Sequence, residues 1–408
     1  MDGQAEEVES KPSWFLAIPL EVRLTVYGIV IDKYPPPSLA ILNVCKQIRE
    51  EAFPVLLRDT KYFKRFEGFR KWIFEANPKL LEKIVDIDIR CKGDWLSAIA
   101  DDLVRLEGAD ELRKITSRWW EAEHARHMRG SEPVEASKDA LSLPQRIVQV
   151  ISSLTHGEPS AIKTTWDGLS ALPNVQKLWI SLGRGRGGNE RRDFKIEQQL
   201  LLDVVPAAMP NMRSFTFFPS LISLRFLGGF TELRELRFTG YSTSTPEDTL
   251  IILRSLKRLH TLIVYRYPEF YDGDSSIVTA ELPKYLSLTP DVISGLNPLR
   301  ELVVYHMTSK IPSAHVTTSV VESLRLAHRE SLQSLRLHSD HVIDEEVLRE
   351  LLRLMSQTVH LRRLSLRLIL NGHLENLDIR PFLPATVGEF EGYVKVPKKK
   401  VWLESMSC

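Results

Sequence analysis

Aromatic and basic side chains alternate with apolar residues in short segments of the second half of the chain. Successive side chains of a strand point to opposite faces, so the residues between the apolar positions share one surface. Aromatic residues and arginine dominate the energetics of interfaces, and paired arginines bind carboxylate or phosphate groups. This surface predicts binding of a protein or peptide with an apolar anchor and an acidic or phosphorylated end. The candidate partner-binding residues are Trp179, Phe218, Arg237, Tyr265, Tyr305, Arg336, His338, Arg363 and Arg367.

The order of these residues divides the surface into two parts. Ile263 and Val303 continue the aromatic stripe through its middle, whereas the arginines and His338 make its C-terminal end basic. An alternative is that loops or the C-terminal tail cover some of these side chains.

Such a surface needs a framework of aligned strands, and a repeated pattern indicates one. Eight segments share the order apolar, two residues, apolar, one residue, apolar. Each unit of such a repeat has a hydrophobic face that only a neighbouring unit covers, which predicts a stacked solenoid that binds partners. The segments are Ile84-Ile87-Ile89, Val175-Leu178-Ile180, Met212-Phe215-Phe217, Leu233-Leu236-Phe238, Leu259-Leu262-Val264, Leu299-Leu302-Val304, Leu332-Leu335-Leu337 and Leu361-Leu364-Leu366.

Helix signals lie between these predicted strands. Thr245 and Thr289 are each followed by proline and then an acid, which is typical of a helix start. Asp344 precedes an apolar-periodic helix that runs through Met355. The alternation of strand, loop and helix resembles leucine-rich repeats over about 200 residues, although the asparagine usual after the third apolar position is mostly absent. We therefore expect an irregular α/β solenoid with parallel strands on its concave face and helices outside.

Three other motifs do not complete a site. Gly183 to Gly188 contains GxGxxG, but no helix begins directly after it, and the next strand ends at Pro219 without an acid, so a solvated loop is predicted. His124 and His127 could reach one ion, yet no third ligand has suitable spacing. The histidines form no nucleophile–base group. The chain is accordingly predicted to use no metal or cofactor and not to be an enzyme.

Composition narrows the location and the partners. The formal net charge of +1 gives no global field toward nucleic acid or membranes, so neither is expected as a partner. No apolar run reaches the length of about 18 residues that suits a membrane span. The acidic start differs from a secretory signal, and three cysteines without metal spacing fit a reducing compartment. We expect a protein of the cytoplasm, the nucleus or both.

A helix predicted from Leu20 onward has two apolar faces. At 100° per residue, Leu20, Leu24, Tyr27 and Ile31 share one direction. The roughly opposite direction carries Val22, Val26, Ile29 and Val30. One face can pack within its own domain, and the second needs a further layer or a partner. Both a buried helix of a small helical unit and a docking helix for another protein remain open.

The residues around this helix resemble a fungal F-box-like domain. The matching segments are Trp14 to Arg23, Val26-Tyr27, Leu42 to Ile48 and Glu50 to Leu57, which follow a leucine-proline-x-glutamate start, an isoleucine-tyrosine pair, a cysteine-arginine-glutamine centre and a glutamate-alanine finish. Over about 45 residues the match is close. The chain departs from the pattern at Ile18, Val26, Lys46 and Leu57, by mild changes of size and charge.

The resemblance implies a substrate receptor of SCF-type cullin–RING ubiquitin ligases. In that family the F-box helices dock onto the Skp adaptor of the cullin complex, and a C-terminal repeat domain captures the protein to be ubiquitylated. By position, the adaptor contacts would be Ile18, Pro19, Leu20, Val22, Val26, Leu39, Leu42 and Val44. The alternative is a scaffold outside the ubiquitin system, whose N-terminal helices cap the first repeat.

These readings divide the chain into five parts. We expect a disordered tail over residues 1–11, a helical F-box-like module over 12–63, and a first repeat strand with a helical insertion over 64–170. The leucine-rich-repeat domain covers 171–385, and a C-terminal tail covers 386–408. The identity of the target does not follow from the sequence.

Overall fold

The computed structural model describes most of the chain in separate stretches. These are residues 14–32, 44–58, 61–63, 66–89, 94–105, 161–181, 195–218, 222–266, 285–306, 314–370, 383–396 and 399–407. Several predictions fall outside them: the adaptor contacts Leu39 and Leu42, the motif from Gly183 to Gly188, and the His124–His127 pair.

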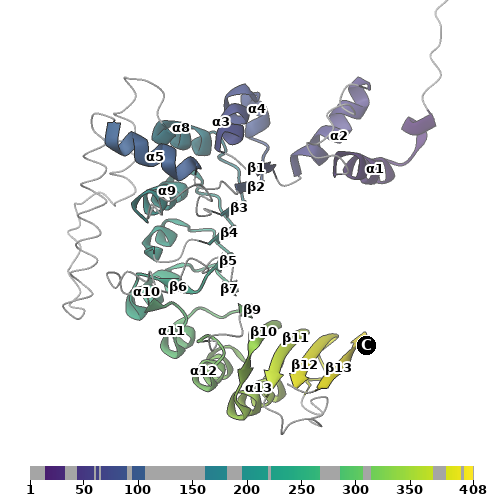
Figure 1. The fold of residues 1–408 in the computed structure, drawn as a ribbon. Helices are drawn as coiled ribbons and strands as arrows, with labels where there is room; N and C mark the ends of the chain where they lie inside the picture. The colour runs from purple at the N-terminus through teal and green to yellow at the C-terminus, as the bar shows by residue number, and fades with distance from the viewer. Residues whose placement is uncertain are drawn as a thin grey trace, which may run out of the picture.

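A two-helix module opens the described chain. A short 3₁₀ helix, η1 (Trp14–Ala17), leads through Pro19 into α1 (Leu20–Asp32), and α2 (Lys46–Arg58) packs against α1. Figure 1 shows this pair beside one end of the rest of the molecule. The predicted helix from Leu20 onward is confirmed.

An eleven-stranded sheet runs through the remainder of the chain. Its neighbours are parallel, except that the last pair is antiparallel. The strands in order are β1 (Lys61–Phe63), β2 (Asp86–Ile89), β3 (Lys177–Ile180), β4 (Ser214–Phe217), β5 (Glu235–Phe238), β7 (Thr261–Arg266), β9 (Glu301–His306), β10 (Ser334–Ile343), β11 (Arg363–Leu370), β12 (Glu389–Val396) and β13 (Lys399–Ser407). A separate pair joins β6 (Tyr241–Ser242) to β8 (Tyr285–Leu286).

Helices follow the outer side of the curve while the strands line its inner side (Figure 1). They are α3 (Phe66–Glu75), α4 (Pro78–Leu81), α5 (Asp94–Arg105), α8 (Ala161–Ser170), α9 (Lys195–Ala208), η4 (Leu224–Gly229), α10 (Pro246–Ser255), α11 (Pro290–Gly295), α12 (Thr318–His328) and α13 (Glu345–Gln357). Alternating strands and outer helices make this a leucine-rich-repeat-like solenoid, as predicted.

Strand register explains the spacing of the apolar residues. The middle apolar residue of each repeat pairs directly with its equivalent in the next strand, as Leu236 does with Leu262, Leu262 with Leu302, and Leu302 with Leu335. All four side chains are buried in one continuous core. The eight predicted strands are therefore confirmed as neighbours whose apolar residues share one interior.

The predicted helix starts are also confirmed. Thr245 and Thr289 accept hydrogen bonds from the amides of Asp248 and Val292, and each is followed by proline in the first turn. Asp344 precedes α13 without a side-chain cap bond, so here the acids Glu345 and Glu346 of the first turn supply the favourable interaction with the helix dipole.

Polar side chains bridge successive repeats just before the strands. Asn174 and Asn211 donate to the carbonyls of Glu82 and Pro173, at 2.7 and 3.0 Å, and Asn297 donates to the carbonyl of Arg254 at 3.0 Å. Ser331 and Thr386 do the same for Leu299 and Leu361, each at 2.8 Å. These bonds connect each repeat to the one before it.

The sheet extends beyond the expected repeat domain at both ends. Residues 386–408 were expected to be a tail, but they contribute β12 and β13, because β12 pairs in parallel with β11 and continues its register. The first repeat strand was expected within 64–170, but β2 (Asp86–Ile89) is preceded in the sheet by β1 and pairs with both β1 and β3. The repeat array therefore begins before residue 171 and includes the described parts of the segment 64–170.

Candidate docking helices and concave face

The N-terminal module has its own small core, distinct from that of the solenoid. Tyr27 of α1 and Ile48 and Ala52 of α2 are buried there, and Phe15 and Leu24 pack around them. The ring centroids of Phe15 and Tyr27 lie 5.9 Å apart, so η1 joins the same cluster. One face of α1 is thus satisfied inside the module.

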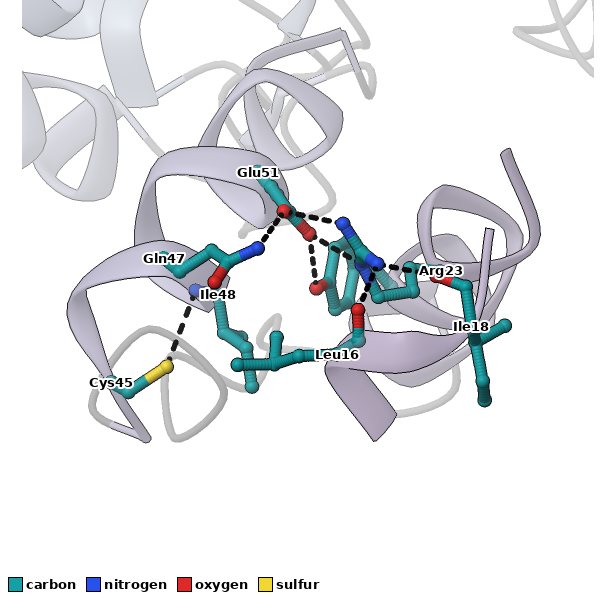
Figure 2. Close-up of polar contacts among 8 residues, drawn as sticks. Leu16, Ile18, Arg23, Cys45, Gln47, Ile48 and Glu51 are labelled. Atoms are coloured by element: carbon teal, nitrogen blue, oxygen red, sulfur yellow. Dashed lines mark hydrogen bonds and ion pairs between the residues drawn. The ribbon is translucent and has the colours of Figure 1, made fainter. Parts of the chain in front are cut away.

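Arg23 and Glu51 form the polar centre of the module (Figure 2). Arg23 Nε donates to Glu51 Oε2 at 2.8 Å, and its Nη2 donates to Oε1 at 2.6 Å, which is a two-pronged pair. Arg23 Nη1 donates to the main-chain carbonyls of Leu16, at 2.8 Å, and of Ile18. Tyr27 Oη and Gln47 Nε2 also donate to Glu51, at 2.8 and 2.9 Å.

This network shifts the titration of its members. The hydrogen bonds from Arg23 lower the pKa of Glu51 from 4.5 to about 2. Burial raises the pKa of Tyr27 to about 12, and its hydrogen bond to Glu51 adds to the effect. Glu51 is therefore a carboxylate, and Tyr27 a neutral phenol, throughout the physiological range.

Several apolar side chains of the module are open to solvent. They run from 43% exposed at Leu20 to 78% exposed at Trp14, with Val22, Ile29 and Val44 between them. Of the predicted adaptor contacts, Leu20, Val22, Pro19 and Val44 are exposed, and Ile18 and Val26 are half-buried. The prediction that α1 has two apolar faces is confirmed, because Tyr27 and Leu24 face the module core while Val22 and Ile29 face outward.

Leu20 differs from the expected arrangement. We placed it on the same face as Leu24 and Tyr27, but its side chain is exposed. It is the first residue of α1, and so it lies beyond the cluster formed with α2. Leu20 is therefore an exposed apolar residue at the start of the helix.

The predicted partner-binding residues share the inner face of the sheet. Tyr265, Tyr305, His338 and Arg367 pair in one row across β7, β9, β10 and β11. Trp179, Arg237 and Arg336 lie in the neighbouring row, with Ile263 and Val303 between the arginines. Arg363 pairs with Ser334 one row further. Alternation along each strand is what brings them to one side.

Ring contacts join the aromatic residues of these two rows into one continuous series. The centroid distances are 5.3 Å for Trp179–Phe218 and 5.9 Å for Phe218–Tyr265, followed by 4.9 Å for both Tyr265–Tyr305 and Tyr305–His338. Tyr265 and Tyr305 stack within 5° of parallel, so the faces between them contact each other. The series therefore does not present those faces for stacking with a flat ligand such as a nucleobase.

Accessibility varies along this series. Trp179, Tyr265, Tyr305 and His338 are half-buried. Phe218 is only 6% exposed, and Val303 in the neighbouring row only 2%. Phe218 thus acts mainly as packing beneath its neighbours, and the accessible apolar groups are Trp179 and the two tyrosines.

The arginines of this face each have a carboxylate partner. Arg336 lies 3.5 Å from Glu301, Arg363 lies 3.0 Å from Glu389, and Arg367 lies 3.4 Å from Asp340. Arg237 pairs with Glu235. The C-terminal end was expected to be basic, but these acids balance its arginines. Glu389 belongs to β12, which lies in the segment that we expected to be a tail, so its negative charge was absent from the prediction.

His338 also contributes less positive charge than expected. Burial lowers the pKa of His338, so its imidazole is mainly neutral at neutral pH. Ser365 Oγ donates to Glu391 Oε2 at 3.2 Å, which leaves His338 Nε2 as the donor to Ser365 Oγ, at 2.8 Å. His338 is thereby tied to Ser365 of β11 and through it to Glu391 of β12.

Sequence reasoning missed the polar residues at the centre of the N-terminal module. Arg23 and Glu51 are 28 residues apart and match no motif for an ion pair. Arg23 is nevertheless an arginine on a helix that is otherwise apolar on two sides, and Glu51 falls in the glutamate-alanine segment. These two positions are the sequence features that could have predicted the ion pair.

Neither a membrane helix nor a metal cluster is found in the parts of the chain that the structure describes. There, no helix combines the length and the hydrophobicity needed to cross a membrane. Across the same residues, no three histidine, cysteine or acidic side chains gather closely enough to hold a metal ion.

Comparison with known proteins gives distant structural likenesses. No family model matches the chain, and no curated protein matches it. An internalin of Listeria monocytogenes aligns at 17% identity and a TM-score of 0.27, over 56% of this chain and 51% of that one, so the chain spans about half its length. The Rad7 and Elc1 complex of yeast aligns at 15% identity and a TM-score of 0.31, over 90% of this chain and 92% of that one. The fold assignment therefore depends on the strand register described above.

Proposed function

We propose that the chain is a substrate-recognition adaptor of an SCF-type cullin–RING ubiquitin ligase. The N-terminal module docks onto a Skp-type adaptor, and the concave face of the solenoid holds a target protein. The chain raises the concentration of that target near a ubiquitin-charged enzyme, so catalysis belongs to its partners. It acts in the cytoplasm, the nucleus or both.

The observation that carries the proposal is the number of apolar side chains that the module leaves exposed. Trp14, Leu20, Val22, Ile29 and Val44 remain open although the module already has a core around Tyr27. An apolar surface that its own domain does not cover favours a protein partner. The resemblance to F-box-like domains supplies the identity of that partner, and it assigns Ile18, Pro19, Leu20, Val22, Val26 and Val44 among the contacts.

The packing favours docking over the alternative of a simple cap. The first units of the solenoid are covered by α3 and α4, whose Phe66, Phe69 and Leu81 are buried in the solenoid core. The α1–α2 cluster is separate from that core, although Phe53 of α2 packs against the solenoid core. A cap would be expected to share the core of the array that it covers.

Binding to the adaptor can be tested by co-elution. We expect the purified chain to co-elute with a Skp-type adaptor, and the Leu20→Asp/Val22→Asp variant to bind at least about tenfold more weakly, because its charges must enter an apolar interface. The matched control, Ile251→Asp/Leu326→Asp, alters two apolar residues of the outer helices that are more exposed than Leu20 and Val22, and it should bind normally. If the wild type and the variant both fold and neither binds, the scaffold alternative is correct.

The target site is proposed on the accessible aromatic residues and the arginines beside them. Trp179, Tyr265 and Tyr305 offer an apolar anchor site. Partly exposed ion pairs such as Arg336–Glu301 and Arg367–Asp340 are worth about 0–1 kcal/mol. A phosphate or carboxylate with two oxygens that accept from the paired N–H groups of one arginine could therefore displace the internal acids. The proposed target segment accordingly has an acidic or phosphorylated end.

Loss of two of these arginines should release the target. We expect Arg336→Ala/Arg367→Ala to lose partners that the wild-type chain retains in a quantitative pull-down. Arg258→Ala/Arg349→Ala is the matched control, because both residues pair with acids on other surfaces, Glu232 and Glu345. Retention of every wild-type partner by the concave-face variant would remove the acidic end from the proposal.

A further inference from the structure

We propose that Arg23 is a positioning residue for the docking surface, acting through its bonds to the carbonyls of Leu16 and Ile18. This inference rests on the proposed function, because it concerns the same module and the same adaptor. It concerns the geometry of the turn that displays the exposed apolar residues.

Arg23 holds that turn from two directions. Its side chain binds the carbonyls of Leu16 and Ile18, which lie on either side of the end of η1 (Figure 2). Its main-chain amide donates to the carbonyl of Pro19 at 3.1 Å, as does the amide of Val22. The residues that enter α1 are therefore tied to one arginine, and Leu20 and Val22 follow directly from the restrained segment.

Only an arginine can make this set of contacts. The planar guanidinium uses Nε and Nη2 for Glu51 and Nη1 for both carbonyls, whereas a lysine ammonium is a compact group with three donors. Glu51 in turn receives two bonds from Arg23 and one each from Tyr27 and Gln47. Its four lone-pair sites are occupied, so the carboxylate holds the guanidinium in one orientation.

A restrained turn lowers the entropic cost of docking. The side chains of Trp14, Leu20 and Val22 can bind together only if η1 and the start of α1 keep one relative orientation. If the carbonyl bonds are lost, that segment must be ordered when the adaptor binds, which weakens affinity without removing a contact. The expected loss is about tenfold.

Three variants of the full chain separate positioning from stability. Arg23→Lys keeps the positive charge but lacks the planar guanidinium that binds Glu51 and both carbonyls at once. The exchanged pair Arg23→Glu/Glu51→Arg restores opposite charges between α1 and α2, but a carboxylate at position 23 cannot donate to the carbonyls. Glu50→Gln alters an exposed acid of α2 that pairs with Lys46, so it is the control. Each is measured for adaptor affinity and for hydrogen exchange of the amides of residues 15–20, with exchange in α2 as the check on folding.

The expected results differ between the three variants. Arg23→Lys and the exchanged pair should bind about tenfold more weakly and exchange faster at residues 15–20, while α2 in the exchanged pair stays protected. Glu50→Gln should change neither the affinity nor the exchange. Normal affinity in Arg23→Lys, or in the exchanged pair, would overturn the inference and leave the proposed function intact. A wild-type chain that does not bind the adaptor would overturn both.

Discussion

Replacement of Leu262 by alanine should lower the free energy of unfolding by about 2–5 kcal/mol. Leu262 is fully buried, and it pairs directly with Leu236 on one side and Leu302 on the other. The substitution leaves a cavity in the centre of the array, where the neighbouring repeats are themselves held by register and cannot collapse freely. Urea unfolding followed by circular dichroism would measure the loss.

Ile251→Ala is the matched control for this effect. It removes a comparable aliphatic side chain from the outer side of α10, where Ile251 is 67% exposed, and should change stability by no more than about 0.5 kcal/mol. Equal losses in the two variants would mean that burial in the shared core is not what stabilises the array. Because each repeat contacts mainly its neighbours, the unfolding midpoint and the slope should be compared together.

Replacement of Glu51 by glutamine should lower the free energy needed to open the N-terminal module by about 3 kcal/mol. The variant leaves the buried guanidinium of Arg23 without its carboxylate, and it replaces one of the two oxygens that accept from Arg23, Tyr27 and Gln47 by an NH2 donor. Hydrogen exchange of α1 and α2 in the full chain would report the change, since the module has its own core. Glu50→Gln is the control, because the neighbouring Glu50 is exposed and lies 4.0 Å from Lys46.

The same carboxylate predicts an acid-dependent loss of the module. The pKa of Glu51 is about 2 in the folded chain, and its ordinary value, which applies to the unfolded chain, is 4.5. Between these two pH values the unfolded chain therefore binds more protons than the folded chain. The contribution of Glu51 is therefore complete above about pH 4.5 and is lost as the pH falls toward 2. Exchange protection of α1 should fall across this range in the wild type, and Glu51→Gln should lack that dependence. A wild-type profile as flat as that of the variant would contradict the assigned role.

Much of the repeat architecture follows from the sequence by itself. The apolar spacing in segments such as Leu233-Leu236-Phe238 indicated which side chains enter the core, and the threonine-proline pairs indicated where the outer helices begin. These features depend on local backbone geometry, which repeats every two residues in a strand and every 3.6 in a helix. The two apolar faces of α1 were predictable for the same reason.

Only the tertiary structure decided which polar groups meet. Arg23 reaches Glu51 across 28 residues, and the arginines of the concave face reach acids on neighbouring strands, including Glu389 of a segment without the repeat pattern. The strands β12 and β13 extend the sheet by main-chain pairing at its edge, at β11. Their own sequence lacks the apolar spacing that predicts the eight repeat strands. Contacts between residues distant in the chain depend on register and packing, and these carry no periodic signal in the sequence.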